Sequence, residues 1–546
     1  MNIALAQLNY HIGNFEHNTK KIIEHIELAK AKGADLVVFA ELAVCGYPAR
    51  DFLEFDEFIE LCEKAAAEIA TKCHGIACII GLPVKNDVLA GKDLYNAAYF
   101  IEDGRIKNIV KKALLPTYDV FDEYRYFEPA IHFECIRFKG QKIALTICED
   151  LWNINNNPLY ASSPMDELIR QKPDLMINIA ASPFSYCHDD ERVVVLSDNA
   201  KKYKLPLLYV NQVGAQTEII FDGGSMVFDK KGKLVDEMPY FREALKVYEL
   251  EGGHFKGLSS IVHEAAPDIE QIYEALVLGI KDYFDKSGFS KAVLGLSGGI
   301  DSAIVCALAC RALGPENVMA VLMPSKYSSD HSIDDALDLV KNIGCKHEIV
   351  PIAPAADAFD QMMAPAFQGL PFNLTEENIQ ARCRGIILMA MSNKFGYILL
   401  NTSNKSECAV GYGTLYGDMC GAIGVIGDVY KIQVYQLANY INKDGIVIPE
   451  NSIVKPPSAE LRPGQKDSDS LPDYDILDKI LFQYIELKQS STAIIAQGYD
   501  EALVKRILKM VNNAEFKRYQ TPPILRVSPK AFGMGRRMPI VGKYLS

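Results

Sequence analysis

The sequence predicts an α/β protein built from two successive domains, and three observations support this fold class. The chain has 546 residues, well above the ~150 residues of an average domain, so more than one domain is expected. Short apolar runs alternate with polar stretches of helical period along most of the chain, as is typical of α/β layers. Residues 251–267 interrupt this alternation with Gly-Gly, Lys-Gly and Ser-Ser pairs before Pro267, which indicates a linker.

We therefore expect a first domain over residues 1–250, a linker over 251–267 and a second domain over 268–546. In the first domain, apolar runs predict strands at Ile3–Leu8, Leu36–Ala40, Ile76–Leu82, Ile143–Cys148, Leu175–Ala180 and Leu207–Val210. The polar stretches between these runs predict helices at Asn18–Lys32, Glu57–Lys72 and Glu191–Lys204. Residues 229–233 separate two further apolar runs and predict a hairpin.

The second domain shows a regular alternation of strands and helices. The expected strands are Lys291–Leu296, Val318–Met323 and Glu348–Pro351, and the expected helices are Asp268–Lys286, Ala303–Leu313 and Asp330–Ile343. This regularity favours a doubly wound parallel sheet. Gly411–Asp428 and Lys455–Asp475 lack periodicity, and loops of that length are often functional lids.

Composition and charge exclude several classes of protein. Apolar residues make up 49% and charged residues 23% of the chain, which excludes general disorder. No run of ~18 apolar residues and no signal-peptide pattern occur, so we expect a cytoplasmic protein without a membrane partner. The formal charge of −13 argues against a nucleic-acid partner. None of the 13 cysteines is spaced Cys-x-x-Cys, which argues against a disulfide scaffold or a four-cysteine zinc site.

Three reactive side chains, Glu41, Lys112 and Cys148, lie at the ends of apolar strands in the first domain. A cysteine acts as a nucleophile in its thiolate form, so it needs a base and a nearby cation to lower its pKa of ~8.5. Glu41 is a candidate base, and Lys112 is a candidate cation that would stabilise an oxyanion. Taken singly, each residue is more often structural, as a buried cysteine, a helix-capping glutamate or a solvated lysine.

Taken together, these residues and their surroundings resemble the nitrilase, or carbon–nitrogen hydrolase, family, whose catalytic Glu, Lys and Cys occur in this order. The segments Phe39–Pro48, Lys112–Glu123 and Cys148–Trp152 carry the resemblance, which extends over residues 1–250. It implies an α-β-β-α sandwich. It also implies catalysis by Glu41, Lys112 and Cys148 and a glutamine-binding site lined by Tyr118, Ser182 and His188.

A glycine-rich loop, Ser297-Gly-Gly-Ile-Asp-Ser302, follows the first strand of the second domain. Its backbone N–H groups can approach phosphate oxygens, and the helix after it adds a positive N-terminus. No lysine follows Gly299, so the loop is not a Walker motif. It resembles the loop of N-type ATP pyrophosphatases, which implies a Rossmann-like doubly wound sheet. The ATP contacts implied are Gly295, Leu296, Ser297, Gly298, Gly299, Ile300, Asp301, Ser302 and Thr402.

Four further segments resemble the NAD⁺ synthetase branch of that family, in its bacterial glutamine-dependent form: Thr375–Gly385, Thr402–Glu407, Gly411–Asp418 and Lys455–Leu461. The resemblance implies hydrolysis of glutamine to ammonia and ATP-dependent amidation of deamido-NAD⁺, with AMP and diphosphate as products. It implies deamido-NAD⁺ contacts from Asn378, Glu407 and Lys517, Mg²⁺ at Asp301 and Glu407, and a homo-oligomer.

Two alternatives stay open at this point. One is a glutamine-fed pyrophosphatase that amidates a different carboxylate or carbonyl, which an assay of AMP release with candidate acceptors would distinguish. The other is a nucleotide-binding or regulatory protein without catalysis, which glutamine turnover in the absence of an acceptor would exclude. All three thiol-site residues and the phosphate loop are present, and this favours an enzyme.

Overall fold

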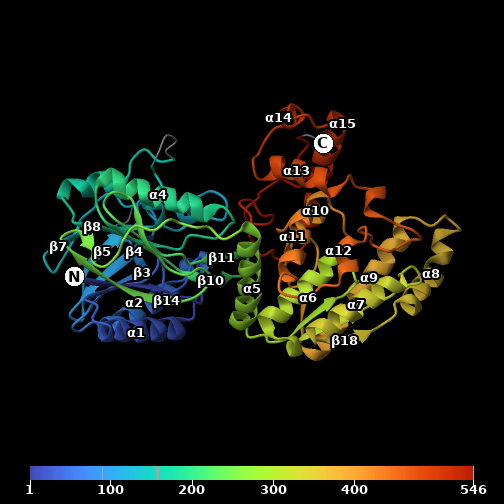
Figure 1. Cartoon of the computed structure of the whole chain (residues 1–546), viewed down its shortest axis with the longest axis horizontal. Coiled ribbons are helices and arrows are strands. Elements are labelled where there is room, and N and C mark those ends of the chain that lie inside the picture. The colour runs from blue at the N-terminus through green and yellow to red at the C-terminus, as the bar shows by residue number, and fades with distance from the viewer. Residues whose placement is uncertain (89, 155–158, 545–546) are drawn as a thin grey trace. The chain divides into compact units, whose positions relative to one another are not determined.

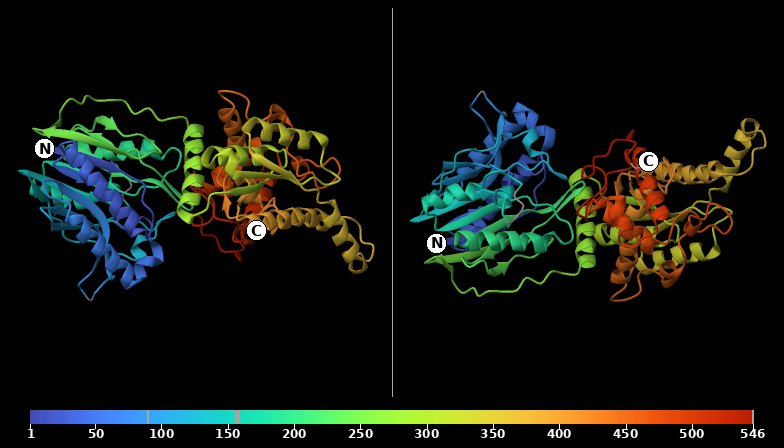
Figure 2. Two further views of the ribbon diagram at one scale, coloured as in Figure 1. Left: turned by 90° about the horizontal axis from the view of Figure 1, so that it is seen from below. Right: turned by 90° about the horizontal axis from the view of Figure 1, so that it is seen from above.

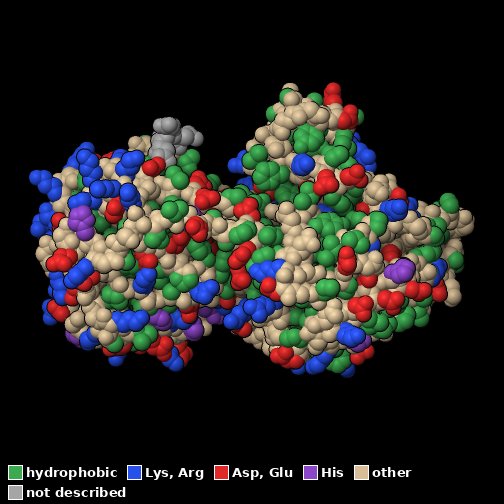
Figure 3. Space-filling view, viewed as in Figure 1, with side chains coloured by type: hydrophobic (Ala, Val, Ile, Leu, Met, Phe, Trp, Pro, Cys, Tyr) green, Lys and Arg blue, Asp and Glu red, His purple; other side chains and the backbone are tan. Residues whose placement is uncertain are grey.

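The computed structural model describes residues 1–88, 90–154 and 159–544. The chain divides into two units, Met1–Ala266 and Pro267–Ser546, each with its own sheets. Within the described residues, no helix has both the length and the apolar character that crossing a membrane requires. Acidic and basic side chains are interspersed on the face of each unit that Figure 3 shows.

Two sheets form the centre of the first unit, in the strand orders β15-β14-β1-β2-β3-β4-β5 and β13-β12-β9-β8-β7-β6. The first sheet consists of β1 (Asn2–Gln7), β2 (Leu36–Val38), β3 (Ala77–Lys85), β4 (Leu94–Glu102), β5 (Arg105–Lys111), β14 (Ala244–Glu251) and β15 (His254–Phe255). The second consists of β6 (Ile136–Phe138), β7 (Gln141–Ile147), β8 (Leu175–Ala180), β9 (Leu207–Asn211), β12 (Met226–Phe228) and β13 (Leu234–Glu237). A separate hairpin pairs β10 (Val213–Gln216) with β11 (Ile219–Asp222).

Helices cover the outer faces of the two sheets. α1 (Phe15–Ala31) contacts β14, and α2 (Asp56–Ala70) contacts β3. α3 (Pro164–Leu168) contacts β7, and α4 (His188–Tyr203) contacts β9 and β12. The sheets meet through β1 against β9 and β5 against β7, and Figure 1 shows α1 and α4 on opposite sides of them. This is an α-β-β-α sandwich, as the nitrilase resemblance predicted.

Several element boundaries differ from the sequence prediction. β7 ends at Ile147, one residue earlier than expected, so Cys148 lies outside the strand. α4 begins at His188, three residues before the predicted helix. His254–Phe255 forms β15 and pairs with β14, so the first residues of the expected linker belong to a sheet of this unit. β8 and β9 are buried at every position because both faces of their sheet are covered.

The second unit is built on five parallel strands in the order β18-β17-β16-β19-β20. They are β16 (Ala292–Gly295), β17 (Val318–Leu322), β18 (Lys346–Ile349), β19 (Ile398–Asn401) and β20 (Ile423–Gly424). In chain order this is 3-2-1-4-5, the doubly wound arrangement that was predicted. The strand order reverses between β16 and β19, and open α/β sheets bind ligands at the carboxyl ends of the strands at such a point.

Helices cover both faces of this sheet. They are α5 (Asp268–Ser287), α6 (Ile300–Leu313), α7 (Asp330–Ile343), α8 (Ala353–Phe367), α9 (Leu374–Phe395) and α11 (Lys431–Ile441). α9 packs Leu388 against Val293 of β16, whereas α6 contacts β16 and β17 and is flanked by α5 and α11. Strand side chains alternate between the two faces of a sheet. α9 therefore lies on one face, and α6, with α5 and α11 beside it, lies on the other. Figure 2 shows α8 projecting away from the sheet.

A group of helices outside the sheet encloses a separate apolar cluster. They are α10 (Lys405–Val410), which lies between β19 and β20, and α13 (Tyr474–Ile485), α14 (Ser491–Ile495), α15 (Glu501–Asn513) and α16 (Glu515–Arg518), which follow β20. α12 (Glu450–Val454) contacts α6 and α7. Leu477, Val504 and Ile507 are fully buried in this cluster. α10 follows the loop after β19, and its contacts with α13 and α15 hold it in place.

Candidate functional site

Cys148 occupies a sharp turn between β7 and a short 3₁₀ helix, Cys148–Leu151. Its φ is 43°, a left-handed conformation that costs energy in a non-glycine residue and often marks a functional position. Asp150 holds the turn by accepting a hydrogen bond from the Ile147 N–H at 3.0 Å. The same carboxylate accepts the N–H groups of Ala113 and Leu114 at 3.0 and 2.9 Å. It therefore ties the segment after Lys112 to the turn that carries the thiol.

Lys112 is completely buried and ion-paired with two carboxylates. Its Nζ donates to Glu41 Oε1 at 2.7 Å and to both carboxylate oxygens of Glu123 at 2.8 Å. Burial lowers the pKa of Lys112, but the charges of Glu123 and Glu41 outweigh burial and hold it well above its ordinary value. Lys112 is therefore a permanent cation. Glu41 also accepts hydrogen bonds from Asn96 Nδ2 at 2.7 Å and from the Ala181 N–H at 3.0 Å.

The Cys148 side chain interacts electrostatically with this charged group. Burial and the charge of Glu41 raise the pKa of Cys148 well above its ordinary value, whereas Lys112 lowers it. The residue is 4% exposed. The thiol is therefore protonated at rest, and attack by its sulfur requires a neighbouring base. The structure thus brings together Glu41, Lys112 and Cys148, which follow the ends of β2, β5 and β7, although these strands belong to two sheets.

Glu123 is a member of this group that the sequence analysis did not single out. Tyr47 donates its hydroxyl to Glu123 Oε1 at 2.9 Å, and burial raises the pKa of Glu123 to about 7. Glu123 stands at the end of the segment that carried the nitrilase resemblance, eleven residues after Lys112. A single sequence does not show that the chain turns back there, so this residue was not distinguishable from a surface acid.

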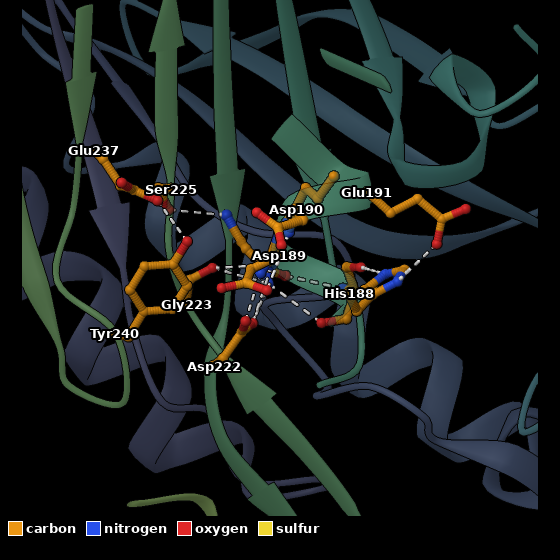
Figure 4. Close-up of polar contacts among 12 residues, drawn as sticks. His188, Asp189, Asp190, Glu191, Asp222, Gly223, Ser225, Glu237 and Tyr240 are labelled. Atoms are coloured by element: carbon orange, nitrogen blue, oxygen red, sulfur yellow. Dashed lines mark hydrogen bonds and ion pairs between the residues drawn. The ribbon is translucent and has the colours of Figure 1, made fainter. Parts of the chain in front are cut away.

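Ser182 and His188, two of the three residues expected to bind glutamine, lie in contact. Ser182 Oγ is 3.3 Å from His188 Nε2, and the Ser182 N–H donates to Asn211 Oδ1 at 2.9 Å. His188 stacks on Trp152 with ring centroids 5.1 Å apart. Figure 4 shows His188 beside Glu191 at the start of α4, and their side chains are 3.4 Å apart.

A buried ion pair contacts Asn211, the residue that holds the Ser182 backbone. Arg192 on α4 is fully buried, and its Nη1 donates to Asp222 Oδ1 at 3.0 Å. The same oxygen accepts Asn211 Nδ2 at 3.4 Å, which links the pair to the residue that holds the Ser182 backbone. Asp222 lies near the start of α4 in Figure 4. Its pairing with Arg192 thus orients Asn211.

Tyr118, the third expected glutamine-binding residue, contacts Glu149 next to the thiol. Its hydroxyl donates to the two carboxylate oxygens of Glu149 at 3.1 and 3.0 Å, and Tyr160 donates to the same carboxylate at 3.1 Å. Burial raises the pKa of Glu149. Tyr118 is 43% exposed. Its ring therefore lies at the boundary between solvent and the buried charged residues.

In the second unit, a cavity of about 320 Å³ opens at the switch point of the parallel sheet. Of the residues expected to bind ATP, it is lined by Gly295, Leu296, Ser297, Gly299, Ile300, Asp301, Ser302 and Thr402. Gly298 is not among the described lining residues and has another role. Its φ is +80°, and a Cβ there would lie 2.0 Å from the carbonyl oxygen of Ser332 on α7. Glycine at this position lets the loop pass close to α7. Gly298 therefore affects the shape of the cavity through the path of the loop.

Asp301 lies at the centre of a charged group in this cavity. Its carboxylate forms an ion pair with Lys431 at the start of α11 and accepts Asn404 Nδ2 at 3.0 Å. Burial, together with the charges of Asp301 and Asp467, raises the pKa of Glu407 well above its ordinary value. Asp301, Glu407 and Asp467 thus interact with one another and with Lys431 in this part of the cavity. The sequence analysis missed Lys431, because it begins an ordinary helix 130 residues after Asp301.

Asn378 and Lys517, expected to contact deamido-NAD⁺, are not among the described residues that line the cavity. Asn378 Oδ1 accepts the Thr414 hydroxyl at 2.8 Å. Lys517 Nζ donates to the carbonyl oxygens of Gly411 and Gly413 at 2.8 and 2.7 Å. Both side chains hold the loop Gly411–Asp418, whose residues Tyr412, Gly417 and Asp418 form part of the cavity wall.

Comparisons with known proteins agree for both halves of the chain. The carbon–nitrogen hydrolase model matches residues 2–252, and the NAD synthase model matches residues 272–521. A glutamine-dependent NAD(+) synthetase from Synechocystis sp. is 48% identical over 98% of each chain, and one from Acinetobacter baylyi is 41% identical over 99% of this chain and 98% of its own. The chain belongs to the glutamine-dependent NAD(+) synthetases.

A solved structure extends this comparison to the fold. The glutamine-dependent NAD⁺ synthetase of Acinetobacter baumannii, in complex with ADP, is 39% identical, with a TM-score of 0.78 over 99% of this chain and 98% of its own. The corresponding enzyme of Cytophaga hutchinsonii is 22% identical with a TM-score of 0.82, which is a likeness of fold. The family resemblance predicted from the sequence is thus confirmed for the whole chain.

Proposed function

We propose that this chain forms NAD⁺ from deamido-NAD⁺, ATP and L-glutamine, with AMP, diphosphate and L-glutamate as the other products. The observation that carries the proposal is the pairing of two sites in one chain. Unit 1 places a cysteine beside a buried Glu–Lys–Glu group, and unit 2 places a phosphate loop at the switch point of a parallel sheet. Relatives named glutamine-dependent NAD(+) synthetase match the chain over nearly their full length.

In unit 1, Cys148 Sγ attacks the side-chain carbonyl carbon of glutamine. Because the thiol is protonated at rest, Glu41 takes its proton and passes it to the departing nitrogen, which leaves as ammonia. Lys112 stabilises the oxyanion, since its charge is fixed by two carboxylates. Water then cleaves the glutamyl thioester, Glu41 accepts a proton from the water, and the sulfur leaves and regains its proton. Ser182, His188 and Tyr118 bind the substrate.

In unit 2, a carboxylate oxygen of the nicotinate group attacks the α-phosphorus of ATP, and the bond to diphosphate breaks. A carboxylate is a poor acceptor for ammonia because oxide would have to leave, whereas the adenylate releases AMP. The loop Gly295–Ser302 and Thr402 hold ATP, and Glu407 contacts deamido-NAD⁺ at the cavity wall. Asn378 and Lys517 act through the loop that they hold.

The carboxylates of the cavity fit a divalent cation. The negative charges of Asp301, Glu407 and Asp467 repel one another, and Lys431 compensates part of this charge. Carboxylate oxygens combined with phosphate oxygens are ligands that Mg²⁺ prefers. Asp301 and Glu407 would hold the ion, which would neutralise charge on the phosphates of ATP.

We also propose that copies of the chain associate in the cytoplasm. α8 has no buried residue among its described positions, and Met362, Leu370 and Leu374 on or beside it are 66–72% exposed. Apolar side chains exposed in this way favour contact with another protein surface. Light scattering of the purified protein should give a mass of more than one chain, and a monomer at micromolar concentration would contradict this proposal.

The division of labour between the units is tested by Cys148→Ala with two nitrogen sources. Glutamine-driven NAD⁺ formation should fall at least about a thousandfold, because the nucleophile is lost. Ammonia-driven formation should stay within about twofold, since Asp301 and its loop are untouched. Cys135→Ala, a half-buried thiol outside the site, is the matched control and should retain both activities. Asp301→Asn should abolish synthesis from either source. Loss of ammonia-driven synthesis in folded Cys148→Ala would contradict the proposal.

A further inference from the structure

Three buried cysteines of unit 2 converge away from the nucleotide cavity. Cys306 and Cys310 lie one turn apart on α6 and so face the same side of the helix. Cys345 lies between the end of α7 and the start of β18. The three sulfur atoms all lie within 4.8 Å of one another, and the three residues are at most 7% exposed. Two segments that are about 35 residues apart in sequence thus contribute to one group of thiols.

The spacing of the sulfur atoms suits a bound metal ion. Cys306 Sγ and Cys345 Sγ are 3.9 Å apart. Two thiolates bound to tetrahedral zinc at ~2.3 Å each lie about 3.8 Å from one another. A disulfide requires ~2.05 Å, so these side chains are not arranged as a covalent pair.

Cys306 Sγ and Cys345 Sγ are also close enough for a thiol hydrogen bond between them. A cation bound by the three sulfur atoms would replace the thiol protons and keep the sulfur atoms in place.

We propose that Cys306, Cys310 and Cys345 bind one thiophilic divalent cation of the zinc type. Each sulfur binds as the thiolate, and the thiol protons displaced by the cation pass to the solvent. Three protein ligands leave one of the four zinc positions for water. Such a site is not recognisable in the sequence, because the pair is spaced Cys-x₃-Cys and the third ligand is remote.

The position of the site suggests what the cation does. α6 begins at Ile300, within the phosphate loop, and Cys306 lies about 9 Å along the helix from that residue. β18 is the edge strand of the sheet. A cation held by all three thiolates would fasten the helix that carries Asp301 to this edge. Its role is structural, because none of the three cysteines is among the described lining residues of the cavity.

The test uses the complete chain, reduced and freed of metal, with Co²⁺ and Zn²⁺ as probes. Co²⁺ should bind one per chain and produce a sulfur-to-cobalt charge-transfer band in the near ultraviolet, and Zn²⁺ should displace it. Co²⁺ at the carboxylates of the cavity would give no such band. Zn²⁺ in hundredfold excess over its dissociation constant should raise the unfolding temperature, since ligands of the folded state stabilise it by about 2.7 kcal/mol.

Variants separate this site from the other ten cysteines. Cys345→Ser should remove the charge-transfer band and the zinc-dependent rise in unfolding temperature. Cys383→Ser, a buried thiol of the same unit outside the group, is the matched control and should keep both. The cobalt spectrum of the unsubstituted chain tests the proposal even if Cys345→Ser does not fold. A spectrum without the band, the same band in Cys345→Ser, or a Cys306–Cys345 disulfide in the isolated protein would overturn it.

Discussion

The two reactive regions differ in how far they exclude water. In unit 1, the side chains of Glu41 and Lys112 are at most 1% exposed, and their charges are fully paired before any substrate binds. In unit 2, the Asp301 side chain is 19% exposed and lines an open cavity together with four further acidic residues, Glu407, Asp418, Glu460 and Asp467. A small amide and a labile thioester need a dry, preorganised site. Two large anionic substrates need an open one whose charge balance is completed on binding.

The largest effect that would sharpen this comparison is expected from Lys431→Met. Removal of this cation leaves Asp301 and Glu407 without their counter-charge, so negative phosphates would no longer be accommodated. We expect NAD⁺ synthesis to fall about a thousandfold with either nitrogen source, an effect of about 4 kcal/mol. Glutamine hydrolysis without ATP should stay within about twofold.

Lys443→Met is the matched control for Lys431→Met, because its ammonium group lies on Tyr440 near the end of the same helix, outside the cavity. It should leave synthesis unchanged. Steady-state rates of NAD⁺ formation with ammonia and with glutamine, and of glutamine hydrolysis without ATP, check all three expectations. Full synthesis by Lys431→Met would show that the charges of the cavity do not need this residue.

A smaller effect, about a hundredfold, is expected from Gly298→Ala. The new Cβ would meet the Ser332 carbonyl oxygen at 2.0 Å, so the phosphate loop must shift, and a displacement of ~1 Å at a reacting group costs about that much. Gly344→Ala has the same φ of +80° but open space around its Cβ. It therefore controls for backbone strain, which costs ~1 kcal/mol, and should keep near-normal synthesis. Equal losses in the two variants would exclude the steric explanation.

The smallest effect, about tenfold on glutamine hydrolysis, is expected from Glu123→Gln. Lys112 would keep Glu41 as its counter-charge but lose the second carboxylate, so its position would be less restrained. Ammonia-driven synthesis should not change. Glu134→Gln, an exposed acid of the same unit, is the control. An unchanged rate of glutamine hydrolysis in Glu123→Gln would show that one carboxylate suffices to hold the lysine.

The same variant has a predictable effect on stability. Burial raises the pKa of Glu123 from 4.5 to about 7, so the folded state retains a proton that the unfolded state loses. This contribution to stability is complete below pH 4.5 and disappears as the pH rises through about 7. In Glu123→Gln the corresponding decrease between these two pH values should be absent. Urea unfolding of both proteins across this range measures the difference.

Local patterns were sufficient to predict many of the strands and helices and the residue types at their ends. Glu41, Lys112 and Cys148 each follow an apolar strand, and the phosphate loop joins a strand to a helix. Strand ends are where α/β layers place reactive groups, so these side chains could be selected before their positions were known. Their catalytic and binding roles stay predictions that the substitutions above will test.

Residues whose importance depends on distant contacts could not be selected in this way. Lys431 appears in the sequence as the first residue of a helix, and Cys345 as a small residue before a strand. Asn378 and Lys517 lie within the residues that match the NAD synthase family model, yet they hold a loop and are not among the described residues that line the cavity. In each case the partner lies 35 to 130 residues away, and a single sequence contains no signal for that contact.

The sequence by itself determined the alternation of strands and helices, the need for glycine in the phosphate loop and the chemical groups available at each strand end. These follow from backbone sterics and hydrophobic period, which act over a few residues. Only the tertiary structure decided that Lys112 pairs with two carboxylates, that the Cys148 thiol is protonated and that three thiols meet beside α6. Charge and protonation depend on desolvation and on neighbours within a few ångströms, and these arise when segments distant in the chain pack together.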